Sequence, residues 1–221
     1  MEPVCHVGVA AVQRLHELGL TPDDLHKAIA GGSAEARLCT EMDAPGMAGY
    51  AFWSRSNRTF RERMAPKGWA FSNAQSILRT IHPSGSFTIT AVSGSGMVGE
   101  EAANFSGDVR TKNPKGPAVA KLVERNYVQL PLFPVARPDV RDEVEVNELP
   151  TWFLLYKSSK EGLSFELSLP VEMHGKHVDT WRERIILDDN PFLGAEFDIK
   201  RLDEIPAMSP VEVPVEFKGA L

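Results

Sequence analysis

The stretch "TWFLLYKSSKEGLSFELSLPVEM" (residues 151–173) decides the fold. It opens with a run of apolar residues, and its second half alternates, with Phe165, Leu167 and Leu169 separated by polar side chains. A period of two places these three side chains on one face of a strand. Because a Lys-Glu-Gly turn separates the two halves, the pattern predicts two antiparallel strands. The segment "HVDTWRERIIL" (177–187) predicts a third strand beside them.

Two further segments carry strand patterns. The segment "VEVPVEF" (211–217) alternates apolar and acidic residues, and Pro214 suits a strand at the edge of a sheet. Upstream, two β-rich runs flank His82–Gly85 and predict a β-hairpin over about residues 76–92. Strands are therefore predicted in two parts of the chain, one at about residues 76–92 and one from residue 151 onward, with a long segment between them.

Helix signals fill the first third of the chain. Thr21 has the side chain of an N-cap, and Pro22 suits the first helical position. Gly31 and Gly32 predict the end of this helix, and Ser33 is a candidate N-cap for the next one.

Apolar residues at helical spacing predict three more helices. One covers about residues 9–18, one covers 50–64, and one begins at Pro117 and ends near Arg125. The residues expected on one face of the second are Tyr50, Trp53, Phe60 and Met64. With the strand signals, these helices predict the α+β class, made of a helical N-terminal third, a β-hairpin and a C-terminal antiparallel β-meander.

The expected domain organisation has three parts. Residues 1–128 form a helical region that includes the β-hairpin. Residues 129–149 form an extended linker, because prolines and an acidic run follow one another there. Residues 150–221 form an antiparallel sheet region, which we expect to pack with the first region as one globular unit.

Composition narrows the class of protein. The chain has 221 residues, of which 43% are hydrophobic and 24% are charged, as in ordinary globular proteins. No apolar run approaches the ~20 residues that span a bilayer, so no membrane partner is expected. Glu2 and the lack of a basic N-terminal region predict a helix there and not a signal peptide. Two cysteines, Cys5 and Cys39, are too few for a disulfide scaffold, and we therefore expect a cytoplasmic location.

Charge is distributed unevenly along the chain. Residues 50–125 carry eleven basic and five acidic side chains, whereas the segments on either side are acidic. A basic middle with interleaved Trp53, Phe60 and Trp69 is typical of a nucleic-acid face. The candidate nucleic-acid-binding residues are Arg55, Arg58, Arg110, Lys112 and Lys115. The alternative is that the acidic segments neutralise this basic middle within the fold.

A short peptide motif follows the helix that begins at Pro117. Gln129-Leu130-Pro131-Leu132-Phe133 has the form Q-L-x-L-F and resembles the peptide with which many bacterial proteins bind the DNA polymerase sliding clamp. An extended peptide of this kind inserts apolar side chains into a preformed groove. The resemblance implies that Gln129 is a polar anchor, Leu130 a shallow contact, and Leu132 and Phe133 the deep contacts. The alternative is that the same side chains pack on the protein's own core.

The main functional hypothesis is a non-enzymatic accessory protein of DNA transactions, of bacterial or phage type, that docks on the sliding clamp. Neither a catalytic residue nor a metal site nor a cofactor is predicted. The segment "GSGMVG" (94–99) matches the G-x-G-x-x-G pattern of dinucleotide-binding sites. A turn-rich segment follows it, however, in place of the helix that such a site requires. One alternative is a metal-dependent nuclease or other nucleic-acid-modifying enzyme that uses acids of the meander, such as Glu166, Glu172, Asp179 and Glu183. Another is a structural subunit of a larger assembly.

Overall fold

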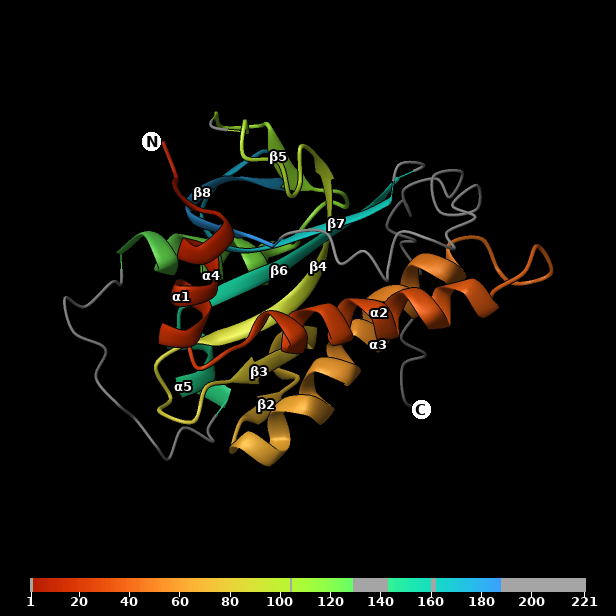
Figure 1. Cartoon of the computed structure of the whole chain (residues 1–221), viewed down its shortest axis with the longest axis horizontal. Coiled ribbons are helices and arrows are strands. Elements are labelled where there is room, and N and C mark those ends of the chain that lie inside the picture. The colour runs from red at the N-terminus through yellow and green to blue at the C-terminus, as the bar shows by residue number, and fades with distance from the viewer. Residues whose placement is uncertain (1, 104, 129–142, 160–161, 188–221) are drawn as a thin grey trace, which may run out of the picture.

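The computed structural model describes residues 2–103, 105–128, 143–159 and 162–187 (Figure 1). It confirms the α+β class, with helices in the N-terminal part and a sheet that continues toward the C-terminus. Three predicted features lie outside these residues: the clamp-type motif at 129–133, the strand at 211–217 and the turn at 160–161. None of the helices in the described part combines the length and apolar character needed to cross a bilayer.

The predicted meander forms the centre of the sheet. Strands β6 (Thr151–Ser159), β7 (Gly162–His174) and β8 (His177–Ile186) pair antiparallel in this order, which confirms the three predicted strands. On one side of them, β1 (Val4–His6) pairs parallel with β8. This edge strand was not predicted, because three residues are too few to show a period.

The hairpin joins the same sheet on the other side. Strand β3 (Arg79–Ile81) pairs antiparallel with β4 (Thr88–Gly96), and β2 (Ala70–Ser72) pairs with β3. Strand β4 also pairs parallel with β6, so that the hairpin and the meander share one sheet, with the order β1-β8-β7-β6-β4-β3-β2 within the described residues. The sheet is therefore mixed, and the prediction of antiparallel pairing alone was wrong for β4, which pairs antiparallel with β3 and parallel with β6.

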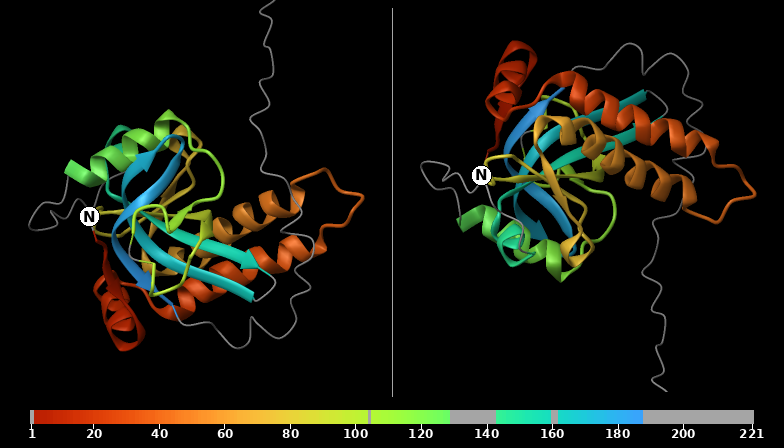
Figure 2. Two further views of the ribbon diagram at one scale, coloured as in Figure 1. Left: turned by 90° about the horizontal axis from the view of Figure 1, so that it is seen from above. Right: turned by 90° about the horizontal axis from the view of Figure 1, so that it is seen from below.

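Helices cover both faces of this sheet (Figure 2). Helices α1 (Gly8–Glu17), α2 (Pro22–Leu38) and α3 (Met47–Met64) lie on one face, whereas α4 (Pro117–Val128) lies on the other.

Side chains of β6 alternate between the two faces of the sheet. Trp152 and Leu154 belong to the core under α1–α3, and Phe153 and Leu155 belong to the core under α4. A strand buried on both faces has no polar side, which explains why the run at 152–156 is continuously apolar.

Helix α2 does not end at Gly31 and Gly32, as predicted, but continues to Leu38. A side chain at Gly31 would place its Cβ 2.4 Å from Thr59 Oγ1, and one at Gly32 would place it 2.0 Å from Ser56 Oγ. The two glycines therefore permit the close approach of α2 and α3, which run side by side in Figures 1 and 2. Ser33 lies buried inside α2 and is not an N-cap. The N-cap at Thr21 is confirmed, with its full capping box.

Two other expectations about helices need correction. The buried face of α3 contains Phe52, Phe60 and Met64, whereas Tyr50 is 59% exposed, so the predicted face is rotated. The predicted extended linker at 129–149 contains a short helix, α5 (Glu143–Glu148). This helix is held because Arg79 donates a hydrogen bond of 2.9 Å to the carbonyl of Val146.

Candidate functional site

The candidate site begins at a gap in the strand pairing. Strand β3 pairs with β4 at Thr88 and Ile89, and β5 (Val109–Thr111) pairs with it at 94–96. Among the described strands, none pairs with residues 90–93 of β4 on this side. Here the edge of β4 is completed by other groups, since the backbone N–H of Lys112 donates to the carbonyl of Ser93 at 2.9 Å.

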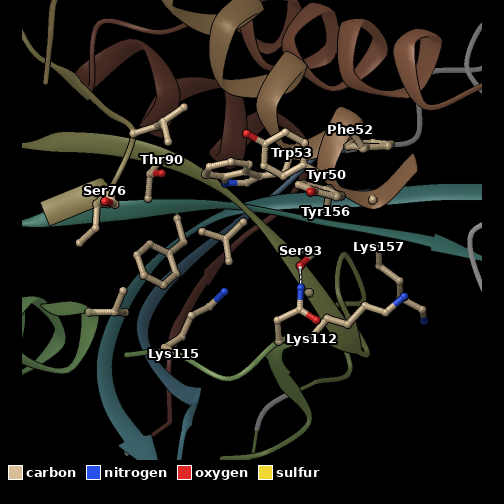
Figure 3. A pocket seen from close by; sticks show the side chains of 18 of the residues that line it. Tyr50, Phe52, Trp53, Ser76, Thr90, Ser93, Lys112, Lys115, Tyr156 and Lys157 are labelled. Atoms are coloured by element: carbon tan, nitrogen blue, oxygen red, sulfur yellow. Dashed lines mark hydrogen bonds between the residues drawn. The ribbon is translucent and has the colours of Figure 1, made fainter. Parts of the chain in front are cut away.

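A cavity of about 340 Å³ opens at this gap (Figure 3). Its size is within the range of small-molecule sites, which is ~300–1,000 Å³. The wall combines residues from both faces of the sheet, since Tyr156 belongs to the core under α1–α3 and Phe153 belongs to the core under α4. Residues far apart in the sequence therefore meet at one place.

One wall of the cavity is aromatic. Tyr50, Phe52 and Trp53 come from the first half of α3, and Tyr156 comes from β6 (Figure 3). Phe52 and Tyr156 are stacked, with ring centroids 4.2 Å apart, and the rings of Tyr50 and Trp53 are 5.5 Å apart. Burial raises the pKa of Tyr156 well above its usual value, so its hydroxyl stays neutral. Tyr50 is the exposed member, and its ring is accessible to a ligand.

The opposite wall carries three lysines (Figure 3). Lys112 and Lys115 follow β5, and Lys157 lies in β6. Lys157 Nζ donates to the carbonyl of Gly96 at 2.7 Å and lies 4.0 Å from Glu100 Oε1. Burial lowers the pKa of Lys115 to about 8. No aspartate or glutamate is among the described residues that line the cavity, so the site favours an anion.

Hydroxyl groups complete the lining. Ser158 Oγ is buried and has no hydrogen-bond partner within the described part of the chain. A buried polar atom without a hydrogen-bond partner destabilises the folded protein. A ligand that supplies the missing partner removes this cost and so binds more favourably. Gln75 and Ser76 adopt the left-handed backbone conformation, with φ of 56° and 59°, and Ser76 lines the cavity. Such strain in residues other than glycine gathers at functional sites.

The five candidate nucleic-acid residues lie in different places. Lys112 and Lys115 line the cavity, and Arg110 is exposed on β5 outside it. Arg55 and Arg58 lie on α3, where Arg55 pairs with Glu35 at 3.0 Å and Arg58 pairs with Glu62 at 2.7 Å. The structure thus brings two of the five together and leaves the two helical arginines in ion pairs.

Sequence reasoning missed several members of the site. Among the missed residues, only Lys157 has a sequence feature that could have marked it, because it follows directly on the apolar run of β6. That feature is weak, since solvated lysines are also common at strand ends. Ser76 and Ser158 have no signal at all, since their importance depends on which side chains surround them. Tyr50 and Trp53 were noted as aromatic residues, but Tyr50 was expected on the same helix face as Phe60 and Met64, which are buried.

Most acids considered for a nuclease are held by basic partners. Glu166 and Arg184 form a buried ion pair at 2.5 Å, and Glu183 pairs with Arg14 at 2.5 Å. Asp179 Oδ1 lies 2.8 Å from His174 Nδ1, which raises the pKa of His174. Among the described residues, no three His, Cys, Asp or Glu side chains are grouped as they would be around a metal ion.

The glycines of residues 94–99 serve packing. A Cβ at Gly94 would lie 2.7 Å from Val98 Cγ2, and one at Gly96, where φ is 79°, would lie 2.0 Å from the carbonyl oxygen of Asp108. Gly94 lies near the end of β4 and Gly96 is its last residue, and the chain then turns instead of entering a helix. The G-x-G-x-x-G match here is therefore a tight strand end, followed by the turn-rich segment that its sequence predicts.

Comparison with family models, with curated proteins and with solved structures gives no match to this chain. The cavity and the residues that line it are therefore the basis for assigning a function to this protein.

Proposed function

We propose that this protein is a non-enzymatic, cytoplasmic accessory protein of DNA transactions, and that it binds nucleic acid at the cavity beside β4. One observation carries the proposal: three lysines face an aromatic wall, and no carboxylate is among the described lining residues. Lysines neutralise phosphates and release counterions, and aromatic side chains stack on bases of any sequence.

The charges of the cavity are available to a ligand. In the described part of the chain, no ion pair joins Lys112 or Lys115 to a carboxylate. By contrast, Arg55 and Arg58 are already paired with glutamates. A phosphate that approached the helical arginines would have to compete with those glutamates, whereas one that approached the cavity would not.

The test is fluorescence anisotropy with a labelled oligonucleotide at several salt concentrations. The variant Lys112→Ala/Lys115→Ala is expected to lose about tenfold or more in affinity and to lower the salt slope by about 2. The matched control is Arg55→Ala/Arg58→Ala, which removes the same charge from outside the cavity and should bind like the wild type. Equal losses in both variants would show that the effect is net charge and not this site.

A second function is favoured by the Q-L-x-L-F sequence at 129–133, which resembles the clamp-binding peptide. Helix α4 packs on the sheet through Leu122 and Val123 and ends at Val128, the residue before Gln129. A clamp-bound peptide that starts there would keep the domain close to the DNA that the clamp encircles. Such tethering raises the local concentration of the second, weaker contact.

Clamp docking is tested by surface plasmon resonance against a bacterial sliding clamp. The wild type is expected to bind with a Kd on the order of micromolar, and Gln129→Ala/Leu132→Ala/Phe133→Ala is expected to abolish binding. A chain in which the same five residues stand in scrambled order is the matched control and should also fail to bind. Undiminished binding by either variant would remove clamp docking from the proposal.

A further inference from the structure

The cavity is a recess and not a flat basic face. It is set into the open edge of β4, and Phe153, Leu122 and Val92 give it an apolar floor. A flat basic face would suit the backbone of a duplex, whereas a recess with an aromatic wall admits a single flat group. The shape of the cavity therefore favours a single flat group, such as one base, over the backbone of a duplex.

We infer that the cavity receives the base of one unpaired nucleotide, stacked on the aromatic wall at Tyr50 and Trp53, with its phosphate at Lys112 and Lys115. The inference rests on the proposed nucleic-acid binding and names its ligand class. The ligand chemistry is a heteroaromatic base joined to a phosphate, and it is supplied either by an unpaired position in a DNA strand or by a free nucleotide.

The aromatic wall has room for a stacked base. Trp53 packs against the core under α1–α3, and Tyr50 lies one helical turn before it with most of its surface exposed. Their ring centroids are 5.5 Å apart and the rings are inclined at 51°, so the two rings form one aromatic surface whose outer member, Tyr50, is exposed to a ligand. Gly49 is also in the lining, and the space beside it is open, since a Cβ there would meet no atom within 4 Å.

A buried hydroxyl group offers a polar contact to the edge of a base. Ser158 Oγ is buried and has no partner among the described residues, and it lies in the lining of the cavity. Every base carries donors and acceptors on the edge that pairs in a duplex. That edge is free only in an unpaired nucleotide, so this hydroxyl fits an unpaired base better than a paired one.

Phosphate and base can be held at the same time because the two walls face each other. In Figure 3 the aromatic side chains lie beneath the helices, and Lys112, Lys115 and Lys157 lie across the cavity from them. Lys157 is already bonded to the carbonyl of Gly96, which leaves Lys112 and Lys115 as the phosphate contacts.

The experiment compares four ligands with the full chain: a single strand, the blunt duplex of the same sequence, that duplex with one bulged base, and a nucleoside monophosphate as competitor. The single strand and the bulged duplex are expected to bind about tenfold or more tightly than the blunt duplex. If the monophosphate competes, a free nucleotide is sufficient to fill the cavity. If the monophosphate does not compete but the single strand binds tightly, the ligand is an unpaired position in a strand. Both results support the inference and distinguish the source.

The variant Tyr50→Ala tests the stacking, and because Tyr50 is exposed, the fold should tolerate the change. It is expected to reduce the preference for the single strand over the duplex by about tenfold, whereas Tyr50→Phe keeps the ring and should behave like the wild type. Equal affinity of the wild type for single strand and blunt duplex would overturn the inference and leave the proposed function intact, provided that Lys112→Ala/Lys115→Ala still loses binding. Absence of binding to all four ligands would overturn both.

Discussion

The side-chain amide of Asn57 pairs with the backbone of Ala91 as a neighbouring strand would. Asn57 Oδ1 accepts a hydrogen bond from the N–H of Ala91 at 2.9 Å, and Asn57 Nδ2 donates to the carbonyl of Ala91 at 3.2 Å. All of these groups are buried. A side chain from α3 thus satisfies the edge of β4 at the point where strand pairing is interrupted, and the cavity can open beside it without leaving these backbone groups unpaired.

Replacement of Asn57 should therefore destabilise the protein. Asn57→Ala would leave the N–H and the carbonyl of Ala91 buried without partners, and we expect a loss of about 2–4 kcal/mol in the free energy of unfolding, measured by urea denaturation. Asn113→Ala is the matched control, because its 3.4 Å contact with Ser93 is long and only partly buried, and it should change stability by less than about 0.5 kcal/mol. Similar losses for the two variants would show that the pairing at Ala91 has no special weight.

Alanine substitutions at two helical glycines are expected to have opposite effects on stability, because Gly32 lies in the contact between α2 and α3 and Gly49 does not. Alanine is favoured over glycine in a helix by about 1 kcal/mol, so Gly49→Ala, whose Cβ meets nothing within 4 Å, should stabilise the protein by several tenths of a kcal/mol to about 1 kcal/mol. Gly32→Ala should destabilise it by about 1–3 kcal/mol, because its Cβ would lie 2.7 Å from the carbonyl oxygen of Phe52. Thermal unfolding measures both, and stabilisation by Gly32→Ala would contradict the close packing.

Local sequence patterns predicted the features that depend on neighbouring residues, and they failed for the features that depend on contacts between distant parts of the chain. Thr21 caps α2 through groups within three residues of it, so the sequence alone was sufficient. Gly31 and Gly32 carry the same local signal whether they end a helix or admit a neighbouring helix, and only the position of α3 decides between the two. The parallel pairing of β4 with β6 joins residues about sixty positions apart, which no periodicity can show.

The candidate site depends on that pairing. Lys112 and Lys115 were predicted from local charge, but Lys157 faces them only because β6 lies beside β4. Arg55 and Arg58 looked equally suitable in sequence, and their glutamate partners could be recognised only in part: Glu62 is one helical turn from Arg58, whereas Glu35 belongs to another helix. The clamp-type motif at 129–133 stays a prediction.

Ligand binding should weaken as the pH rises. Because burial lowers the pKa of Lys115 to about 8, this amine is charged below that pH and becomes neutral above it. Affinity for a phosphate ligand is therefore expected to fall between about pH 7 and about pH 9, while the phosphate charge hardly changes. Lys115→Arg keeps its charge over this range, so anisotropy titrations of that variant should show a much smaller fall. An identical fall in both proteins would place the titrating group elsewhere.

Acid should destabilise the contact between Asp24 and Lys67. Burial alone would raise the pKa of Asp24, but hydrogen bonds from Lys67 and Thr21 outweigh it and bring the pKa below the usual 3.8. The stabilisation from the charged form is therefore present above the usual pKa and is lost as the pH falls through the lower pKa of the folded state. Lys67→Met should reduce this loss in urea midpoints measured from about pH 6 to about pH 3. Lys27→Met, an exposed lysine on the same helix as Asp24, is the control and should leave the loss unchanged.

The most direct test of nucleic-acid binding at the cavity is hydrogen–deuterium exchange of the full chain with and without a saturating single-stranded oligonucleotide. We predict slower exchange in three segments that meet only at the cavity, namely 46–53, 111–116 and 156–158. Unchanged exchange in these segments, with slower exchange instead around Arg55–Arg63 or in none of the described residues, would contradict the proposal that the lysine and aromatic walls hold the ligand.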